Sequence, residues 1–287
     1  MANSTSATRA AVVVGGANGL GRAFCRLLAD DGWHVVVADI DETAAAETLQ
    51  VVAAAGGRIE FERLDATDLK QWQALHDRLR IKFSALDLLV NSAGVTATGE
   101  VGEQAAETWR WLIEINLLGV VWGCHTFVPW LKDNRRGANL INVASFAAMY
   151  SSPNLAAYNL AKAGVVSLSE TLFGELRPHG VGVTVVCPGF FPSGLNPRGR
   201  FQTELDRRMT MDNIARSRLT PDEIARDALA KMRRGRLYAV RPRSCRLLWL
   251  FKRCLPTTWL RYVAWERRRS LQRYGVAIDA EKRGRDA

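Results

Sequence analysis

Tyr158 and Lys162 are the residues of this chain whose types and spacing most directly indicate acid–base chemistry. If the segment that joins them is helical, the i, i+4 spacing places the phenol and the ammonium on one helix face. A free tyrosine titrates near ~10, too high for a good base at neutral pH, and an ammonium within reach lowers that pKa by roughly 1–3 units. The pair therefore predicts a tyrosine that exchanges protons near neutral pH, although an ordinary solvated helix pair has the same spacing.

The segments around this pair alternate between two periods over residues 10–190. Short aliphatic or β-branched segments, which predict strands, lie at Ala10–Val14, His34–Asp39, Arg58–Leu64, Leu86–Asn91, Asn139–Val143 and Val181–Cys187. Longer segments of helical character lie at Arg22–Asp31, Glu42–Ala55, Leu69–Phe83, Glu103–Leu131 and Ala156–Arg177. Strands that alternate with helices indicate a parallel sheet, and continuous apolar strands indicate that helices cover both of its faces.

The predicted fold class is therefore α/β, with one doubly wound Rossmann-fold domain at residues 10–240. A flexible N-terminus of residues 1–9 precedes it, and a basic, aromatic helical extension of residues 241–287 follows it. Gly194–Arg200 is expected to be a loop, because it is rich in glycine and proline. Thr220 is expected to cap a helix that runs to about Arg234, before a last strand at Leu237–Val240.

A glycine-rich segment from Gly15 to Gly21 follows the first predicted strand and opens the first predicted helix. Its G-x-x-x-G-x-G spacing allows a tight turn and close approach of the backbone to a pyrophosphate. Asp39 ends the second predicted strand, where a carboxylate accepts hydrogen bonds from ribose hydroxyls and repels a 2′-phosphate; the alternative is a solvated aspartate. Because Ala38 and Ile40 carry no charge to bind that phosphate, NAD is the expected cofactor, with NADP as the alternative.

Further motifs follow in a fixed order along the chain. They are Asp65 after the third predicted strand, Asn91-Ser92-Ala93-Gly94, Asn116, Ser145, the Tyr158 and Lys162 pair, and Pro188-Gly189. With the glycine-rich segment, their order and spacing closely resemble the classical short-chain dehydrogenase/reductase family over residues 10–240. The departures are small: Val14 replaces a usual threonine, Ser92 a frequent asparagine, and Ser193 a frequent threonine whose hydroxyl it keeps.

The resemblance implies a role for each motif residue. Ser145, 13 positions before Tyr158, would polarise the substrate oxygen; Ser151 and Ser152 lie nearer in sequence, but in the following loop. Tyr158 would be the acid–base group, Lys162 would lower its pKa and bind the nicotinamide ribose, and Asn116 would help bind a water that continues the proton path. The implied cofactor contacts are Gly15, Asn18, Gly19, Leu20, Gly21, Asp39, Ile40, Asp65, Ala66, Asn91, Ala93, Gly94, Tyr158, Lys162, Pro188, Gly189, Phe191 and Ser193.

The implied activity is hydride transfer between a secondary alcohol and its ketone. Ser145, Tyr158 and Phe190 are the expected substrate contacts, and Phe146 and Phe191 would help to make the pocket suit a hydrophobic alcohol or ketone. The family also implies a homodimer or homotetramer. The alternatives are an NADP-dependent carbonyl reductase and a nucleotide-binding adaptor whose catalytic residues are vestigial.

Composition narrows the class of protein. The 287 residues, of which 48% are hydrophobic, suffice for a sizeable core. The five cysteines are odd in number and none has C-x-x-C spacing, so neither a disulfide framework nor a metal site is predicted and a reducing compartment is favoured. No signal peptide and no membrane span are expected. The expected localisation is cytoplasmic, with peripheral membrane association as an alternative.

The positive charge of the chain is concentrated near its C-terminus. Residues 231–274 hold 14 Lys and Arg against one acidic residue, Glu266. Aromatic and leucine residues are interleaved with them, and Pro256 is expected to open a helix that Arg267-Arg268-Arg269 closes. Three interpretations remain: a helix pair that caps the substrate cleft or packs on a sister subunit, a segment at residues 241–274 that contacts a membrane surface, or a nucleic-acid-binding segment. Nucleic acid is not expected, because no DNA-binding motif is present.

Overall fold

The computed structural model describes residues 8–193 and 199–275. Residues 1–7, which include most of the N-terminus predicted to be flexible, lie outside the described residues, as do residues 194–198 of the predicted Gly194–Arg200 loop and residues 276–287 of the C-terminal extension. The statements below concern the described residues.

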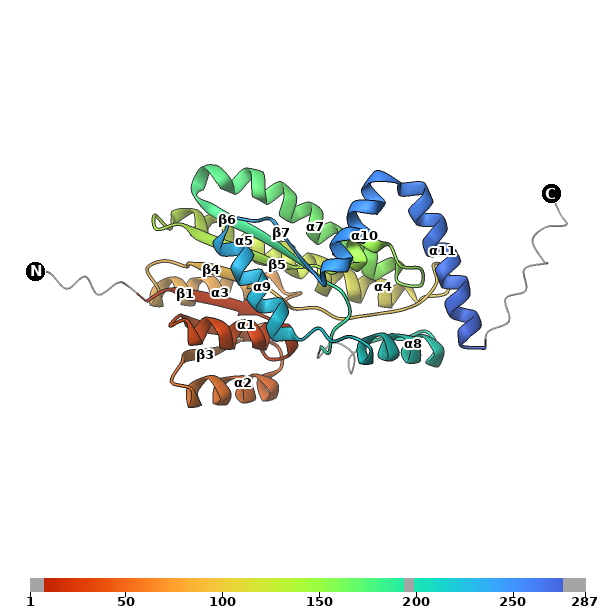
Figure 1. Cartoon of the computed structure of the whole chain (residues 1–287). Helices are drawn as coiled ribbons and strands as arrows, with labels where there is room; N and C mark the ends of the chain where they lie inside the picture. The colour runs from red at the N-terminus through yellow and green to blue at the C-terminus, as the bar shows by residue number, and fades with distance from the viewer. Residues whose placement is uncertain (1–7, 194–198, 276–287) are drawn as a thin grey trace, which may run out of the picture.

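A seven-stranded parallel sheet forms the centre of the molecule (Figure 1). Its strand order is β3-β2-β1-β4-β5-β6-β7. The strands are β1 (Ala10–Val14), β2 (His34–Asp39), β3 (Arg58–Arg63), β4 (Leu88–Asn91), β5 (Ala138–Val143), β6 (Val181–Pro188) and β7 (Tyr238–Arg241). Because β1 pairs with both β2 and β4, the chain reverses its direction of winding there, which confirms the doubly wound α/β fold.

Helices cover both faces of this sheet. One face carries α1 (Gly19–Asp30), α2 (Glu42–Ala54) and α9 (Pro221–Arg233); the other carries α3 (Leu69–Lys82), α5 (Gly119–Asp133) and α7 (Ala156–Leu176). Alternate residues of β1 therefore enter different cores: Val12 and Val14 pack on the α5 side, and Ala11 and Val13 on the α1 side. Burial on both faces explains why the strands are continuous apolar segments, apart from the edge strand β3.

One long helix runs through residues 106–133. It consists of α4 (Ala106–Ile113), a π-helical turn η1 (Glu114–Leu118) and α5. By length and composition alone it passes as a candidate membrane span, which the sequence analysis did not anticipate. In the fold, α5 packs against α3, β4 and β5, and its residues Phe127 and Trp130 belong to the core. A buried core helix of an α/β domain meets the same test.

The remaining helices lie at the cleft end of the sheet or at loops. They are α6 (Ala147–Tyr150), the 3₁₀ turn η2 (Arg177–His179), α8 (Glu204–Ala215), α10 (Arg243–Cys254) and α11 (Pro256–Arg273). Helix α9 begins with the predicted capping box at Thr220. Helix α11 begins at Pro256 as predicted, but its predicted end at Arg267-Arg268-Arg269 is wrong, because the helix continues to Arg273. Helix α8 was not predicted.

Candidate active site

The carboxyl ends of the strands open into a cavity of about 1140 Å³. Parallel strands bring these ends to one edge of the sheet, so residues far apart in sequence meet there. The cavity is lined by all the predicted cofactor contacts except Asn91, and also by Ser145 and Phe190. Asn91 is buried, and its amide donates to Asn142 Oδ1 over 2.9 Å, so its side chain joins β4 to β5 instead.

The glycine-rich segment is shaped by close backbone contacts. Gly15 has a φ of +74°, and a Cβ atom there would lie 2.5 Å from the Ala93 nitrogen. A Cβ atom on Gly21 would lie 1.9 Å from the Gly15 carbonyl oxygen. Asn18 is the N-cap residue of α1, but its side chain makes no capping hydrogen bond, so it leaves the N–H groups of the first turn free of a side-chain cap. The N–H groups of the first turn are therefore available as hydrogen-bond donors, and the backbone beside them is one that only glycine permits. Both features fit a pyrophosphate.

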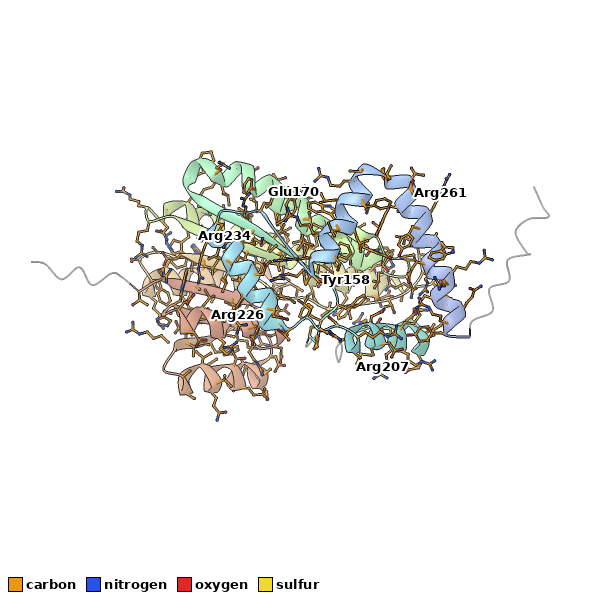
Figure 2. All side chains as sticks on the ribbon, in the orientation of Figure 1. Tyr158, Glu170, Arg207, Arg226, Arg234 and Arg261 are labelled. Carbon is orange, nitrogen blue, oxygen red and sulfur yellow. The ribbon has the colours of Figure 1, made fainter. Side chains whose placement is uncertain are left out.

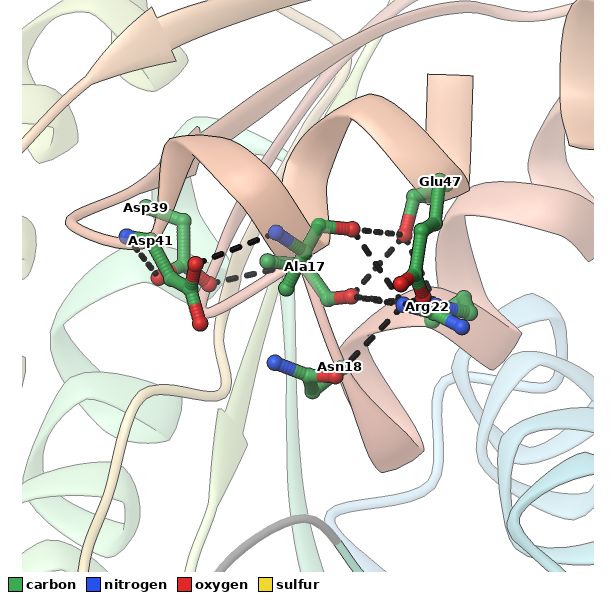
Figure 3. A network of polar contacts seen from close by, with 8 residues as sticks. Ala17, Asn18, Arg22, Asp39, Asp41 and Glu47 are labelled. Carbon is green, nitrogen blue, oxygen red and sulfur yellow. Dashed lines mark hydrogen bonds and ion pairs between the residues drawn. The ribbon is translucent and has the colours of Figure 1, made fainter. Parts of the chain in front are cut away.

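Asp39 is held in a fixed orientation at the end of β2 (Figure 3). Its two carboxylate oxygens accept hydrogen bonds from the backbone nitrogens of Ala17 and Asp41, each over 3.0 Å. Arg22 belongs to the same network, but its guanidinium is bound to Glu47 over 3.0 Å and to Thr48 over 2.8 Å. The carboxylate therefore faces the cavity, while the arginine closest to it in this network already has an acidic partner.

Asp65 and Ala66 form the wall of the cavity beyond β3. One oxygen of Asp65 accepts hydrogen bonds from the Thr67 nitrogen over 2.9 Å and the Thr67 hydroxyl over 2.7 Å. The Ala66 carbonyl accepts a hydrogen bond from the Trp72 indole over 3.0 Å. Both residues are fixed by their own loop, which leaves the second oxygen of Asp65 able to accept a hydrogen bond from a ligand.

Ser145, Tyr158 and Lys162 converge at the carboxyl end of β5. Ser145 follows β5, and the other two occupy one face of α7 as the i, i+4 spacing predicted. The Lys162 ammonium donates to the Val143 carbonyl over 3.0 Å and lies 6.0 Å from the centroid of the Tyr158 ring. Ser145 is hydrogen-bonded to the Tyr158 phenol. The Ser151 hydroxyl instead accepts a hydrogen bond from Lys252, so Ser145 is the serine paired with the tyrosine.

The pKa of Tyr158 departs from the sequence-based prediction. Burial raises it above the ordinary value of 10, and the hydrogen bond with Ser145 opposes this only in part. Burial also lowers the pKa of Lys162 to about 8. The Lys162 ammonium is not among the groups that lower the pKa of Tyr158. The prediction that Lys162 lowers the pKa of Tyr158 is therefore wrong for the chain without its nucleotide.

Asn116 lies beside this group rather than in the wall of the cavity. Its side chain accepts from the Val95 nitrogen and donates to the Val95 carbonyl, each over 2.7 Å. A Cβ atom on Gly94 would lie 2.8 Å from Asn116 Oδ1 and 3.4 Å from Lys162 Nζ. A side chain at this position would therefore crowd the amide of Asn116, so glycine is required where the backbone passes beside both groups. Asn116 itself sits in the π-helical turn η1.

Helices α8 and α11 form the outer wall of the cavity, and sequence reasoning missed the contribution of α8. The lining residues that they contribute include Met209, Asp212, Tyr262, Glu266, Arg267 and Tyr274. The Tyr274 hydroxyl donates to Asp212 over 2.5 Å and joins the end of α11 to α8. The position of α11 agrees with the interpretation of the C-terminal extension as a cap on the substrate cleft, while contact with a sister subunit or with a membrane surface stays a prediction. Thr203, which caps α8 by accepting from the Asp206 nitrogen, was the available sequence signal for α8.

Comparisons with known proteins agree with this geometry. The sequence profile described as short chain dehydrogenase matches residues 9–202. Probable oxidoreductase EphD of Mycobacterium tuberculosis is 33% identical over 183 residues, which are 64% of this chain and 31% of that protein, so the chain spans about a third of this relative's length. Trans-4-hydroxycyclohexanecarboxylate dehydrogenase of Sinomonas cyclohexanicum is 36% identical over 189 residues, 64% of this chain and 72% of the relative.

A solved structure matches a larger share of this chain than these two relatives do. The short chain dehydrogenase/reductase of Burkholderia phymatum, determined in complex with NAD, has a TM-score of 0.78 and 32% sequence identity, and the match covers 81% of this chain and 88% of that one. The glycine-rich segment, the strand order and the cavity fit a nicotinamide dinucleotide. The chain belongs to the short-chain dehydrogenase/reductase family.

Proposed function

We propose that this chain interconverts a hydrophobic secondary alcohol and its ketone with NAD, and that Tyr158 is the acid–base group. The observation that carries the proposal is that one cavity has catalytic side chains at one end and a nucleotide-binding segment at the other. Ser145, Tyr158 and Lys162 converge at one end, and the glycine-rich segment and Asp39 lie at the other. A protein that only bound a nucleotide would have no use for a serine, a tyrosine and a lysine that converge in the same cavity.

The residues divide the chemistry as follows. Ser145 and Tyr158 hydrogen-bond to the substrate oxygen, and Tyr158 takes its proton in oxidation or returns it in reduction. When bound, the nicotinamide ring accepts or donates the hydride at the carbinol carbon. Lys162, anchored on the Val143 carbonyl, binds the nicotinamide ribose. Gly94 lies against both Asn116 and Lys162, and this proximity supports the proposal that Asn116 helps to bind a water on the proton path from Lys162.

Asp39 supports NAD as the preferred dinucleotide. Its carboxylate is fixed by two backbone N–H groups and would lie against a 2′-phosphate, and Arg22 is bound by Glu47. The relative from Burkholderia phymatum was determined with NAD. The NADP-dependent reductase is the alternative that direct affinities would support instead.

The cavity wall supports a hydrophobic substrate. Phe146, Phe190 and Phe191 line it from the sheet side, and Met209 and Tyr262 from the outer wall. The Sinomonas relative is named for a secondary alcohol on a saturated ring that also carries a carboxylate, so it supports the ring and the alcohol but not an entirely apolar substrate. We propose alicyclic or longer-chain secondary alcohols as the first compounds to screen. The homodimer or homotetramer implied by the family stays a prediction.

The test is Tyr158→Phe, assayed with NAD and a panel of hydrophobic secondary alcohols at the absorbance of NADH. Loss of the acid–base hydroxyl should lower kcat by about 10²–10⁴-fold while NADH binding, followed by its fluorescence, stays close to wild type. Tyr150→Phe is the matched control, because Tyr150 lines the same cavity from α6, and it should retain turnover. Turnover by Tyr158→Phe at the level of the control would refute the assignment.

A further inference from the structure

We propose that the outer face of the α10–α11 hairpin docks on an anionic lipid bilayer. This inference concerns a surface and not the reaction, so it holds or fails independently of the proposed activity. Three features of the hairpin support it. The inner face packs on the catalytic domain, the outer face consists of exposed apolar side chains, and arginines form a rim around that outer face.

The inner face of the hairpin is tied to the catalytic domain. The Trp259 indole donates to the Tyr150 carbonyl over 3.1 Å, and Trp259 is buried. The Lys252 ammonium donates to the Ser151 hydroxyl over 2.8 Å. Tyr238 of β7 packs on Trp249, with ring centroids 4.8 Å apart. These contacts fix the hairpin on β7 and on the segment that follows Ser145, so the opposite face is held outward.

That opposite face is apolar. We define the outer face as Leu247, Leu250, Phe251, Leu255 and Leu260. Their exposed fractions lie between 42% and 69%. The first three follow i, i+3, i+4 spacing along α10, so they form one stripe, and Leu255 and Leu260 continue it across the turn into α11. Single apolar side chains scattered over a surface are ordinary, but large apolar side chains gathered in one stripe indicate a contact site.

Arginines surround the outer face. Apart from Arg273, the exposed arginines of the two helices are Arg243, Arg246, Arg253, Arg261, Arg268 and Arg269; Figure 2 shows Arg261 on the outer side of α11. The acidic residue of this region, Glu266, bonds Arg273 over 3.4 Å and lines the cavity, so it does not neutralise the rim. Leucine and aromatic residues beside arginine are the composition of interfacial helices, and basic residues near an anionic surface add electrostatic attraction to it.

The charge also argues against a second copy of the chain as the occupant. A two-fold contact through this face would set the arginine rim of one subunit against the same rim of the other. A bilayer that contains anionic lipid accepts both features at once, since its headgroups pair with the arginines and its acyl boundary accepts the leucines and Phe251. The docked hairpin would then present one side to lipid while α11 lines the substrate cavity on the other.

The test is co-sedimentation of the full chain with vesicles of phosphatidylcholine alone and of phosphatidylcholine with about a third phosphatidylserine. Wild type should bind the anionic vesicles, bind the neutral ones at least tenfold more weakly, and be released by 1 M salt, where the Debye length is about 3 Å. Leu250→Ser with Phe251→Ser should reduce partitioning about tenfold or more. Ile81→Ser is the matched apolar control, because Ile81 is 90% exposed on α3, and it should bind like wild type.

A charge pair separates electrostatics from burial. Arg246→Glu with Arg253→Glu should reduce binding about tenfold or more, and Arg234→Glu with Arg236→Glu, which changes the net charge equally beyond the end of α9, should change it little. Wild type that stays in solution with anionic vesicles would overturn the proposal, as would equal losses in the control variants. Sedimentation velocity without lipid completes the test: if Leu250→Ser with Phe251→Ser lowers the oligomeric state, another copy of the chain covers this face and the lipid proposal is wrong.

Discussion

Replacing Lys162 with methionine should make the stability of the protein respond differently to pH. Lys162 is buried, with its ammonium on the Val143 carbonyl, and its pKa falls from the ordinary 10.5 to about 8. This interval corresponds to about 3 kcal/mol of free energy that the folded chain gives up by holding the charge. Lys162→Met removes that cost but leaves the Val143 carbonyl without its donor, which costs about 1–3 kcal/mol. At pH 7 the two effects nearly cancel.

The pH dependence separates these two effects, because the cost of leaving the Val143 carbonyl without a donor does not change with pH. Between pH 8 and 10.5 the unfolded chain keeps the Lys162 proton and the folded chain has lost it, so the free energy of unfolding rises with pH. Wild type should therefore gain about 2 kcal/mol relative to Lys162→Met between pH 7 and pH 9.5. Groups common to both proteins cancel in the difference.

Urea unfolding of both proteins at the two pH values, without nucleotide, measures this difference. Lys132→Met, which removes an exposed ammonium from α5, is the control, and its difference from wild type should stay constant. The reasoning would be refuted if the difference in free energy of unfolding between wild type and Lys162→Met changed by less than about 0.5 kcal/mol between the two pH values. A buried lysine with a lowered pKa must make the free energy of unfolding rise with pH.

Two further predictions follow from the site. Tyrosinate absorbance of wild type minus Tyr158→Phe, titrated without nucleotide, should show Tyr158 ionising above pH 10, because burial raises its pKa; ionisation below pH 8 would contradict this. Calorimetry should show that NAD binds at least tenfold more tightly than NADP, because Asp39 would face the 2′-phosphate. Asp39→Ser should reduce the ratio of the two dissociation constants. Tighter binding of NADP than of NAD by wild type would favour the reductase alternative.

The sequence predicted the parts of this molecule that depend on local chemistry. The strands were recognisable because two covered faces demand continuous apolar residues, and the glycine-rich segment because Gly15 and Gly21 sit where no Cβ fits. The motif order then placed Ser145, Tyr158 and Lys162 correctly relative to the sheet. Each of these features is determined by a few neighbouring residues and by the topology of a parallel sheet.

The features that the sequence did not predict are tertiary. The raised pKa of Tyr158 results from burial, which spacing on a helix cannot report. The outer wall of the cavity joins α8 and α11 through Tyr274 and Asp212, residues that no motif connects. The end of α11 was misplaced because a run of arginines favours a helix C-terminus without requiring one.

The π-helical turn η1 decides how the long helix at residues 106–133 meets its neighbours. Its buried residues Leu112, Asn116, Val120 and Cys124 recur every four positions. A regular α-helix completes a turn every 3.6 residues, so each such step would rotate the next side chain about 40° out of line. The wider turn absorbs this drift and keeps Leu112 and Asn116 in register with the half of the helix that packs on the sheet. The two hydrogen bonds between Asn116 and the Val95 backbone, beside the candidate active site, therefore depend on the one extra residue that the π-helical turn contains.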